Sequence, residues 1–87
     1  MLIAIRSGIR YRLRYAFCGD RLYVMRYERE HAPTEWMFII VDEIGDFEME
    51  VDGEDAWELE AVLEAAEDEP QSVEETEANV RAWAAKQ

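Results

Sequence analysis

Few side chains in this chain of 87 residues are of the kinds that carry out covalent catalysis. The chain has one histidine, His31, one cysteine, Cys18, and two serines, Ser7 and Ser72. None of them lies in a nucleophile elbow, a Cys–His pairing or another local catalytic signature. The two glycine-rich motifs that bind nucleotide phosphates, G-x-x-x-x-G-K-[ST] and G-x-G-x-x-G, are both absent from the sequence. We interpret His31, near Pro33, as a solvated loop residue and Cys18 as a small core or strand residue. The sequence predicts a protein that is not an enzyme.

Carboxylates are the one abundant group that could take part in chemistry. The stretch DFEMEVDGED, residues 46–55, holds six carboxylates and no Lys or Arg. Paired carboxylates can serve as general acid and base, but with 21 carboxylates in the chain no pair is distinguished from the others. The stretch also imitates the start of a calcium loop, with Glu48 in place of the usual Asp and Leu59 where a bidentate Glu is required. We expect no metal site and no cofactor.

The net charge of −12 is unevenly distributed along the chain. Residues 1–32 hold seven Arg against three carboxylates, whereas residues 33–87 hold 18 carboxylates against Arg81 and Lys86. Residues 42–77 contain 17 carboxylates and no basic residue. Solubility is served by surfaces that mix both signs of charge, so this unmixed run suggests a role in binding. Because so acidic a body repels phosphate at long range, we expect no direct nucleic-acid binding.

Strands are expected to position the basic half of the chain. Residues 9–17 alternate between apolar residues and mainly Arg, which predicts a strand. Its buried face would carry Ile9, Tyr11, Leu13, Tyr15 and Phe17. A two-residue turn at Gly19–Asp20 and a returning strand would complete a hairpin over residues 9–29. Residues 2–6 can be a separate strand or the start of the same one, and Pro33 predicts a loop over residues 31–34. We expect the row of Arg10, Arg12 and Arg14 to pair with carboxylates of neighbouring strands or of a helix.

The acidic half reads as two strands followed by two helices. Residues 36–41 are apolar at every position, as in a central strand covered on both faces. Residues 46–52 predict a strand whose outer row consists of Asp46, Glu48, Glu50 and Asp52. Asp55 with Glu58, and Ser72 with Glu75, have capping-box spacing, which predicts a helix from Asp55 to about Glu67 and a second helix after Ser72. The apolar side of the second helix would carry Val73, Val80, Trp83 and Ala84.

This order of elements predicts a single α+β domain over residues 1–87. We expect a small, mostly antiparallel β-sheet of about four strands, followed by two C-terminal helices packed on it. The apolar run at residues 1–5 is shorter than a signal peptide requires. The longest apolar run, residues 36–41, is far shorter than the roughly 18 residues of a membrane span. We therefore expect a cytoplasmic protein without a membrane partner.

Like charges also recur on the first predicted helix, where Glu60 and Glu64 are four residues apart and Glu67 and Asp68 continue the same ridge. Such pairs oppose helix formation by a few tenths of a kcal/mol. We expect the strand row and this ridge to form one phosphate-like acidic face. The expected contact set is Asp46, Glu48, Glu50, Asp52, Glu60, Glu64, Glu67 and Asp68.

In size, acidity and expected fold class the chain resembles the DNA-mimic and anti-CRISPR proteins of bacteriophages. The resemblance covers these properties and no sequence motif. It implies an inhibitory binding protein whose acidic face blocks the basic nucleic-acid-binding surface of a partner protein or complex. The alternative is a protein-interaction module or small regulatory subunit that binds through an exposed sheet edge or an aromatic patch near Trp57 and Trp83. A homodimer is compatible with either interpretation.

Overall fold

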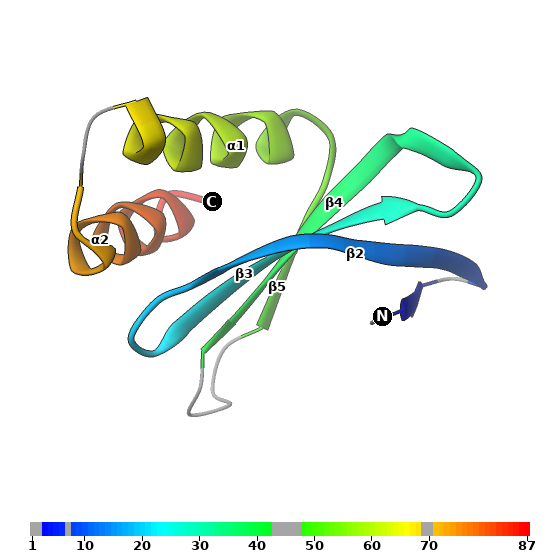
Figure 1. Cartoon of the computed structure of the whole chain (residues 1–87), viewed down its shortest axis with the longest axis horizontal. Coiled ribbons are helices and arrows are strands. Elements are labelled where there is room, and N and C mark those ends of the chain that lie inside the picture. The colour runs from blue at the N-terminus through cyan, green and yellow to red at the C-terminus, as the bar shows by residue number, and fades with distance from the viewer. Residues whose placement is uncertain (1–2, 7, 43–47, 69–70) are drawn as a thin grey trace.

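The computed structural model describes residues 3–6, 8–42, 48–68 and 71–87. These residues form five strands and two helices (Figure 1), with the bounds β1 Ile3–Arg6, β2 Ile9–Cys18, β3 Leu22–Arg29, β4 Ala32–Asp42, β5 Glu48–Val51, α1 Gly53–Asp68 and α2 Val73–Ala84. The strands form one antiparallel sheet in the order β1-β2-β3-β4-β5. The predicted α+β arrangement, an antiparallel sheet followed by two C-terminal helices, is confirmed.

The first strand is separate from the second. β1 pairs antiparallel with the start of β2, so that Ile3 lies opposite Arg12 and Ile5 opposite Arg10. Gly8, between the two strands, has φ +77°, a left-handed conformation that glycine adopts without steric cost. Of the two alternatives for the N-terminal residues, the structure shows the separate strand.

The long strand β2 does not keep one buried face, because a β-bulge interrupts its register with β3. Leu13 lies opposite Tyr27 and Tyr15 lies opposite Arg26, which leaves Arg14 as the extra residue. An extra residue reverses the alternation of side chains beyond it. Leu13 therefore packs on the sheet face away from the helices, while Phe17 packs on the helix-covered face. The expectation that residues 9–17 share a single buried face is wrong for this reason.

The expected loop at residues 31–34 is also wrong. β3 and β4 are joined by a turn at Glu30 and His31, and β4 begins at Ala32. The register shifts from Glu28 opposite Trp36 to Arg29 opposite Ala32, so residues 33–35 fall within an irregularity of the ladder. Pro33 is compatible with this strand because proline, which has no amide donor, occurs in sheets at bulges. His31 is exposed in the turn, as predicted for a solvated histidine.

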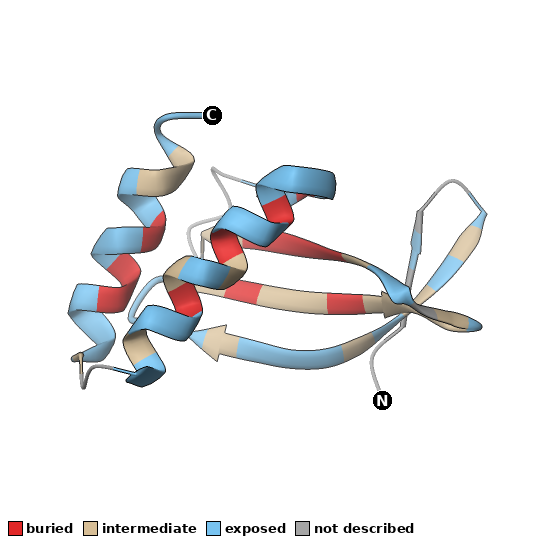
Figure 2. Cartoon of the chain, turned by 90° about the horizontal axis from the view of Figure 1, so that it is seen from above, coloured by how far each residue is buried: buried red, intermediate tan, exposed pale blue. Residues whose placement is uncertain are grey.

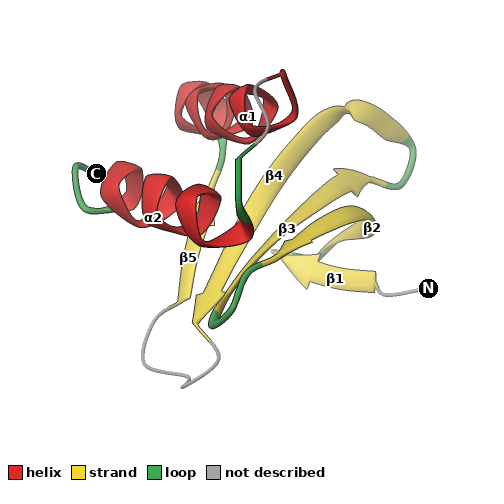
Figure 3. Ribbon diagram, turned by 60° about the vertical axis from the view of Figure 1, so that its left-hand side comes forward, coloured by secondary structure: helices red, strands yellow, loops and turns green. Residues whose placement is uncertain are grey.

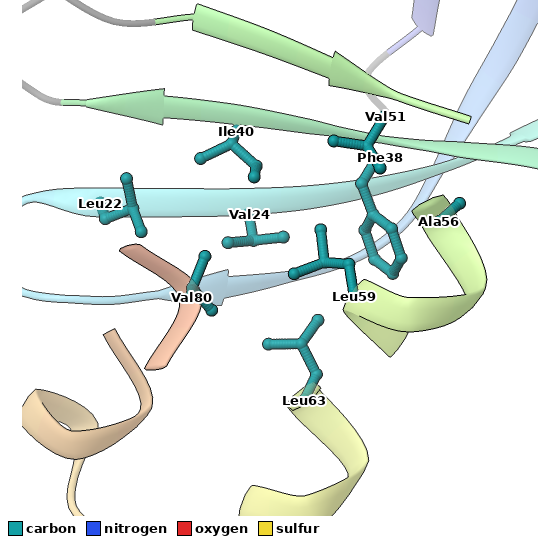
Figure 4. Packing of buried hydrophobic residues seen from close by; sticks show 9 residues of the cluster. All are labelled: Leu22, Val24, Phe38, Ile40, Val51, Ala56, Leu59, Leu63 and Val80. Carbon is teal, nitrogen blue, oxygen red and sulfur yellow. The ribbon is translucent and has the colours of Figure 1, made fainter. Parts of the chain in front are cut away.

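Strand β4 carries the core on both faces, as its uninterrupted apolar run predicts. On the helix-covered face the buried cluster consists of Leu22, Val24, Phe38, Ile40, Val51, Ala56, Leu59, Leu63 and Val80 (Figure 4). A smaller cluster on the opposite face consists of Tyr27, Met37 and Ile39, with Tyr11, Leu13, Met25 and Val41 packed against it. Both helices contribute to the first cluster and lie on the same side of the sheet (Figure 3).

The helix starts differ in how well the sequence predicted them. α2 has the predicted N-cap, because the Glu75 amide donates to Ser72 Oγ at 3.1 Å. α1 begins at Gly53 rather than at Asp55. Its first hydrogen bond is donated by the Ala56 amide to the Asp52 carbonyl. Asp55 therefore lies inside the first turn, where a carboxylate favours the positive end of the helix dipole without capping it.

Two smaller expectations are corrected by the structure. Val73 is 51% exposed at the start of α2, and the buried residues of that helix are Thr76, Glu77 and Val80. The hairpin turn between β2 and β3 spans three residues, from Gly19 to Arg21.

Cys18 is an exposed strand residue at the end of β2. Neither helix in the described ranges is long and apolar enough to span a membrane.

Candidate partner-binding surface

Helix α1 carries the densest unneutralised charge of the described residues. It holds seven carboxylates and no Lys or Arg. Five of these carboxylates have neither an ion pair nor a side-chain hydrogen bond to another described residue, and all five are exposed: Glu54, Asp55, Glu64, Glu67 and Asp68. The outer side of α1 is exposed (Figure 2), and the five carboxylates lie near its two ends, two in the first turn and three in the last two turns. This surface is available to a basic partner.

The strand part of the expected contact set lies on the other side of the molecule. In the β4–β5 pairing Glu50 lies opposite Ile39, and Glu48 lies opposite Val41. Opposed residues project to the same face, so both carboxylates share the face of the Tyr27 cluster, away from α1. The expectation that the strand row and the helical ridge form one face is therefore wrong. Asp52 is exposed at the junction between β5 and α1, and Asp46 lies outside the described residues.

Glu60, the first residue of the predicted ridge, turns toward the sheet. Its Oε2 atom lies 2.5 Å from Arg26 Nη1, and both side chains are partly buried. Arg26 also contacts Glu28 at 3.6 Å and places its guanidinium 4.1 Å from the centroid of the Trp36 ring. Arg26 Nε is buried without a hydrogen-bond partner among the described residues. Glu60 therefore links α1 to β3 through an ion pair and does not belong to the solvent-facing acidic surface.

Three further arginines are neutralised within the molecule. Arg10 contacts Glu30 at 3.2 Å, Arg29 contacts Glu35 at 2.6 Å, and Arg81 contacts Asp42 at 2.9 Å and Glu77 at 3.4 Å. The hydrogen bond to Glu35 raises the pKa of Arg29, and that to Asp42 raises the pKa of Arg81. Of the row Arg10, Arg12 and Arg14 that was expected to pair internally, only Arg10 does so, because Arg12 and Arg14 are exposed and have no acidic partner among the described residues. Apart from Glu60, the carboxylates of α1 have no arginine partner among the described residues.

Glu77 has a structural role that the sequence did not reveal. Glu77 is 8% exposed, and its carboxylate accepts hydrogen bonds from the backbone amides of Asp20 and Arg21, each at 3.1 Å. The turn fits closely, since a Cβ atom on Gly19 would lie 2.8 Å from the Leu22 carbonyl oxygen and 3.1 Å from Glu77 Cδ. Glu77 lies four residues after Val73 and three before Val80, and an acid on the apolar side of a helix is the signal that could have indicated this contact. Glu77 joins α2 to the β2–β3 hairpin.

An aromatic group lies beside the acidic surface. Trp57 of α1 is 65% exposed, and its ring lies 5.4 Å from that of Trp36 in an edge-to-face arrangement. Trp83 of α2 is partly buried and donates its indole N–H to Glu58 at 3.3 Å. Trp57 is therefore held by its neighbour while most of its surface remains in water, an arrangement typical of residues that anchor an interface.

The described residues do not form a metal centre, since no three His, Cys, Asp or Glu side chains within them are grouped closely enough to hold an ion. What the surface can do is attract and bind positive charge. Its solvent-facing carboxylates lie on one helix that packs on the sheet through Ala56, Leu59 and Leu63. No protein family, curated protein sequence or solved structure matches this chain.

Proposed function

We propose that this protein is a small acidic inhibitor that binds the basic nucleic-acid-binding surface of a partner protein or complex, in the manner of phage DNA mimics and anti-CRISPR proteins. The observation that carries the proposal is the set of unneutralised carboxylates on α1, a helix on which only Glu60 has an arginine partner among the described residues. A pre-formed negative surface accelerates encounter with a basic channel and competes with its nucleic acid. In this proposal the protein acts in the cytoplasm and is not an enzyme.

The sequence of α1 supports this proposal because it is poorly suited to stability alone. Its last turn holds Glu67 and Asp68 and no basic residue, although cations are favoured at the negative end of the helix dipole. Glu64 and Asp68 are also a like-charge pair at four-residue spacing. Both features oppose the helix, whereas binding to a basic partner would turn them into favourable interactions.

The test is capture from bacterial lysate with competition by nucleic acid. The immobilised protein is exposed to nuclease-treated lysate and then washed with duplex DNA, followed by single-stranded RNA. We expect a nucleic-acid-binding protein to be retained and then released by one of the two, and its retention to fall steeply between about 50 and about 300 mM salt. Retention that withstands both competitors and salt would contradict the proposal.

A matched pair of variants distinguishes the contribution of the α1 surface to partner binding from the effect of net charge. Glu64→Gln/Asp68→Asn and Glu74→Gln/Glu75→Gln each remove two exposed carboxylates, the first pair from α1 and the second from the start of α2. The α1 variant should lose most of the retained partner, while the α2 variant should keep it. Equal losses would show that net charge, rather than this helix, governs retention.

The exposure of Trp57 favours a second candidate function, a protein-interaction module that binds through its aromatic patch. In that case the acids keep the protein soluble, and Trp57→Ala should abolish an interaction that salt hardly weakens. Truncating an aromatic anchor at the centre of an interface costs about 2 kcal/mol or more of binding energy. An interaction that is strongly salt-dependent and unaffected by Trp57→Ala would exclude this candidate.

A further inference from the structure

An open groove lies between α1 and strand β2 on the helix-covered side of the sheet. Its volume is about 410 Å³, and its walls include Tyr15 and Phe17 from β2, Leu63, Glu64 and Glu67 from α1, and Thr76 from α2. The bulge at Arg14 is what turns Tyr15 and Phe17 toward the helices. The groove therefore joins two acids of the expected contact set to an aromatic wall that the sequence pattern placed elsewhere.

The groove carries a net negative charge. Arg26 also lines it, but this guanidinium is already neutralised by Glu60 at 2.5 Å and Glu28 at 3.6 Å. Glu64 and Glu67 have no cationic partner among the described residues. They are three residues apart on α1, a spacing that places both side chains on neighbouring parts of one helix face. The groove thus offers two carboxylates to a cation from outside.

The aromatic wall is held in place and still accessible. The Tyr15 ring contacts the buried Phe38 ring edge to face, with centroids 6.5 Å apart, and Arg26 lies 5.8 Å from the Tyr15 centroid. Tyr15 nevertheless remains 41% exposed. Aromatic rings attract cations that lie over their faces, and more strongly so when the site is partly desolvated.

We infer that this groove receives an arginine side chain from a basic segment of the partner protein. The inference rests on the proposed function and assigns its recognition site. The aliphatic stem would pack along Phe17 and Leu63, while the guanidinium would lie against Tyr15 and bind the carboxylates of Glu64 and Glu67. Arginine suits these walls better than lysine because its planar guanidinium can stack on a ring and bind two oxygens at once. Nucleic acid does not suit them because its phosphates are repelled by the same carboxylates.

The test uses short peptides in place of the unidentified partner. Three peptides of one length carry arginine, citrulline or lysine at the same central positions, so that the citrulline peptide keeps the shape and loses the charge. Binding is followed by NMR titration of the side-chain resonances of Tyr15, Glu64 and Glu67. We expect saturable shifts at these residues, with roughly tenfold tighter binding of the arginine peptide than of the citrulline peptide.

Variants of the full chain locate the site. Glu64→Gln/Glu67→Gln should weaken binding of the arginine peptide by roughly tenfold, and Tyr15→Leu by roughly threefold. Tyr15→Phe keeps the ring and should retain affinity. The control Glu54→Gln/Asp55→Asn removes the same charge from the other end of α1 and should change affinity by less than about twofold, as expected of screened charges outside the groove.

Several outcomes would overturn the inference. These are equal binding of the arginine and citrulline peptides, shifts spread over all exposed carboxylates, or an equal loss with the Glu54/Asp55 control. Absence of saturable binding would overturn it as well. If the peptide test fails while the lysate capture succeeds, the groove is excluded and the proposed function stands. If the capture fails while the peptides bind the groove, the site stands and the nucleic-acid-mimic function does not.

Discussion

Single side chains hold the layers of this molecule together through charge as well as through apolar contact. Glu77 of α2 accepts two backbone amides of the β2–β3 turn, and Glu60 of α1 binds Arg26 of β3. Each helix is therefore fastened to the sheet by one inward-facing carboxylate in addition to its apolar stripe. In a chain with 21 acids, the few that turn inward differ in role from the many that face solvent.

Glu77→Gln tests the contact between Glu77 and the β2–β3 turn. The carboxamide presents one oxygen and one NH₂ group to two backbone donors, so one hydrogen bond is lost and the other is no longer charge-assisted. We expect the free energy of unfolding to fall by about 1–3 kcal/mol, measured by urea denaturation. The control Glu74→Gln, exposed on the same helix, should change it by less than about 0.5 kcal/mol. Equal effects of the two substitutions would refute the assignment.

Among the elements, the two helices differ in how their ends are stabilised. α2 begins with a Ser72 cap and carries Arg81 in its last turn, which suits its dipole. α1 has acids in its first turn, which is favourable, and acids in its last turn, which is not. This contrast shows that the excess of negative charge is least favourable at the C-terminal end of α1, next to the groove.

Asp68→Lys should stabilise the protein. The substitution places a cation in the last turn of α1 and converts the repulsive pair with Glu64 into an attractive Glu–Lys pair at four-residue spacing. We expect the free energy of unfolding to rise by about 0.3–1 kcal/mol at low salt, with a higher midpoint of thermal unfolding. The matched control Asp55→Lys, at the start of the same helix, should lower the midpoint. A decrease with Asp68→Lys would show that Asp68 has a structural role.

Ser72→Ala tests the start of α2. The hydroxyl that accepts the Glu75 amide is lost, so we expect the free energy of unfolding to fall by about 0.5–2 kcal/mol. Ser72→Asp restores an acceptor at the same position and should recover most of this loss. If the Asp variant is as unstable as the Ala variant, the cap is not the source of the effect.

At the scale of the whole molecule, charge repulsion works against the compact state. The net charge of −12 is distributed over 87 residues, and the arginines that neutralise part of it lie mainly in β2 and β3. Self-repulsion of this kind destabilises a folded chain, and salt screens it. A basic partner would relieve the same repulsion on binding.

Salt should therefore stabilise the free protein. Raising the salt concentration from about 10 to about 150 mM shortens the screening length from about 30 to about 8 Å. We expect the midpoint of thermal unfolding to rise over this range, because the repulsion that is relieved extends over more charges than the few exposed ion pairs that are weakened. Calorimetry at constant pH measures the midpoint at each salt concentration. A midpoint that falls with salt would contradict this account of the electrostatics.

The sequence by itself determined the order and type of most elements. Strand alternation in residues 22–27, the apolar run at 36–41 and the Ser72 cap are local patterns, and local patterns predict local structure. The composition likewise determined that the chain would carry a strongly acidic surface. These features need no knowledge of which residues meet across the fold.

Tertiary structure decided how the charges are grouped. The bulge at Arg14 separated Leu13 from Tyr15, and the pairing of β5 with β4 placed Glu48 and Glu50 on the face opposite to α1. Packing of α1 on β3 turned Glu60 inward. A one-residue shift of register moves a side chain to the other face of a sheet, and no local pattern encodes such a shift. For this reason the acids could be found in the sequence, whereas the groove that joins Glu64 and Glu67 to Tyr15 could be found only in the fold.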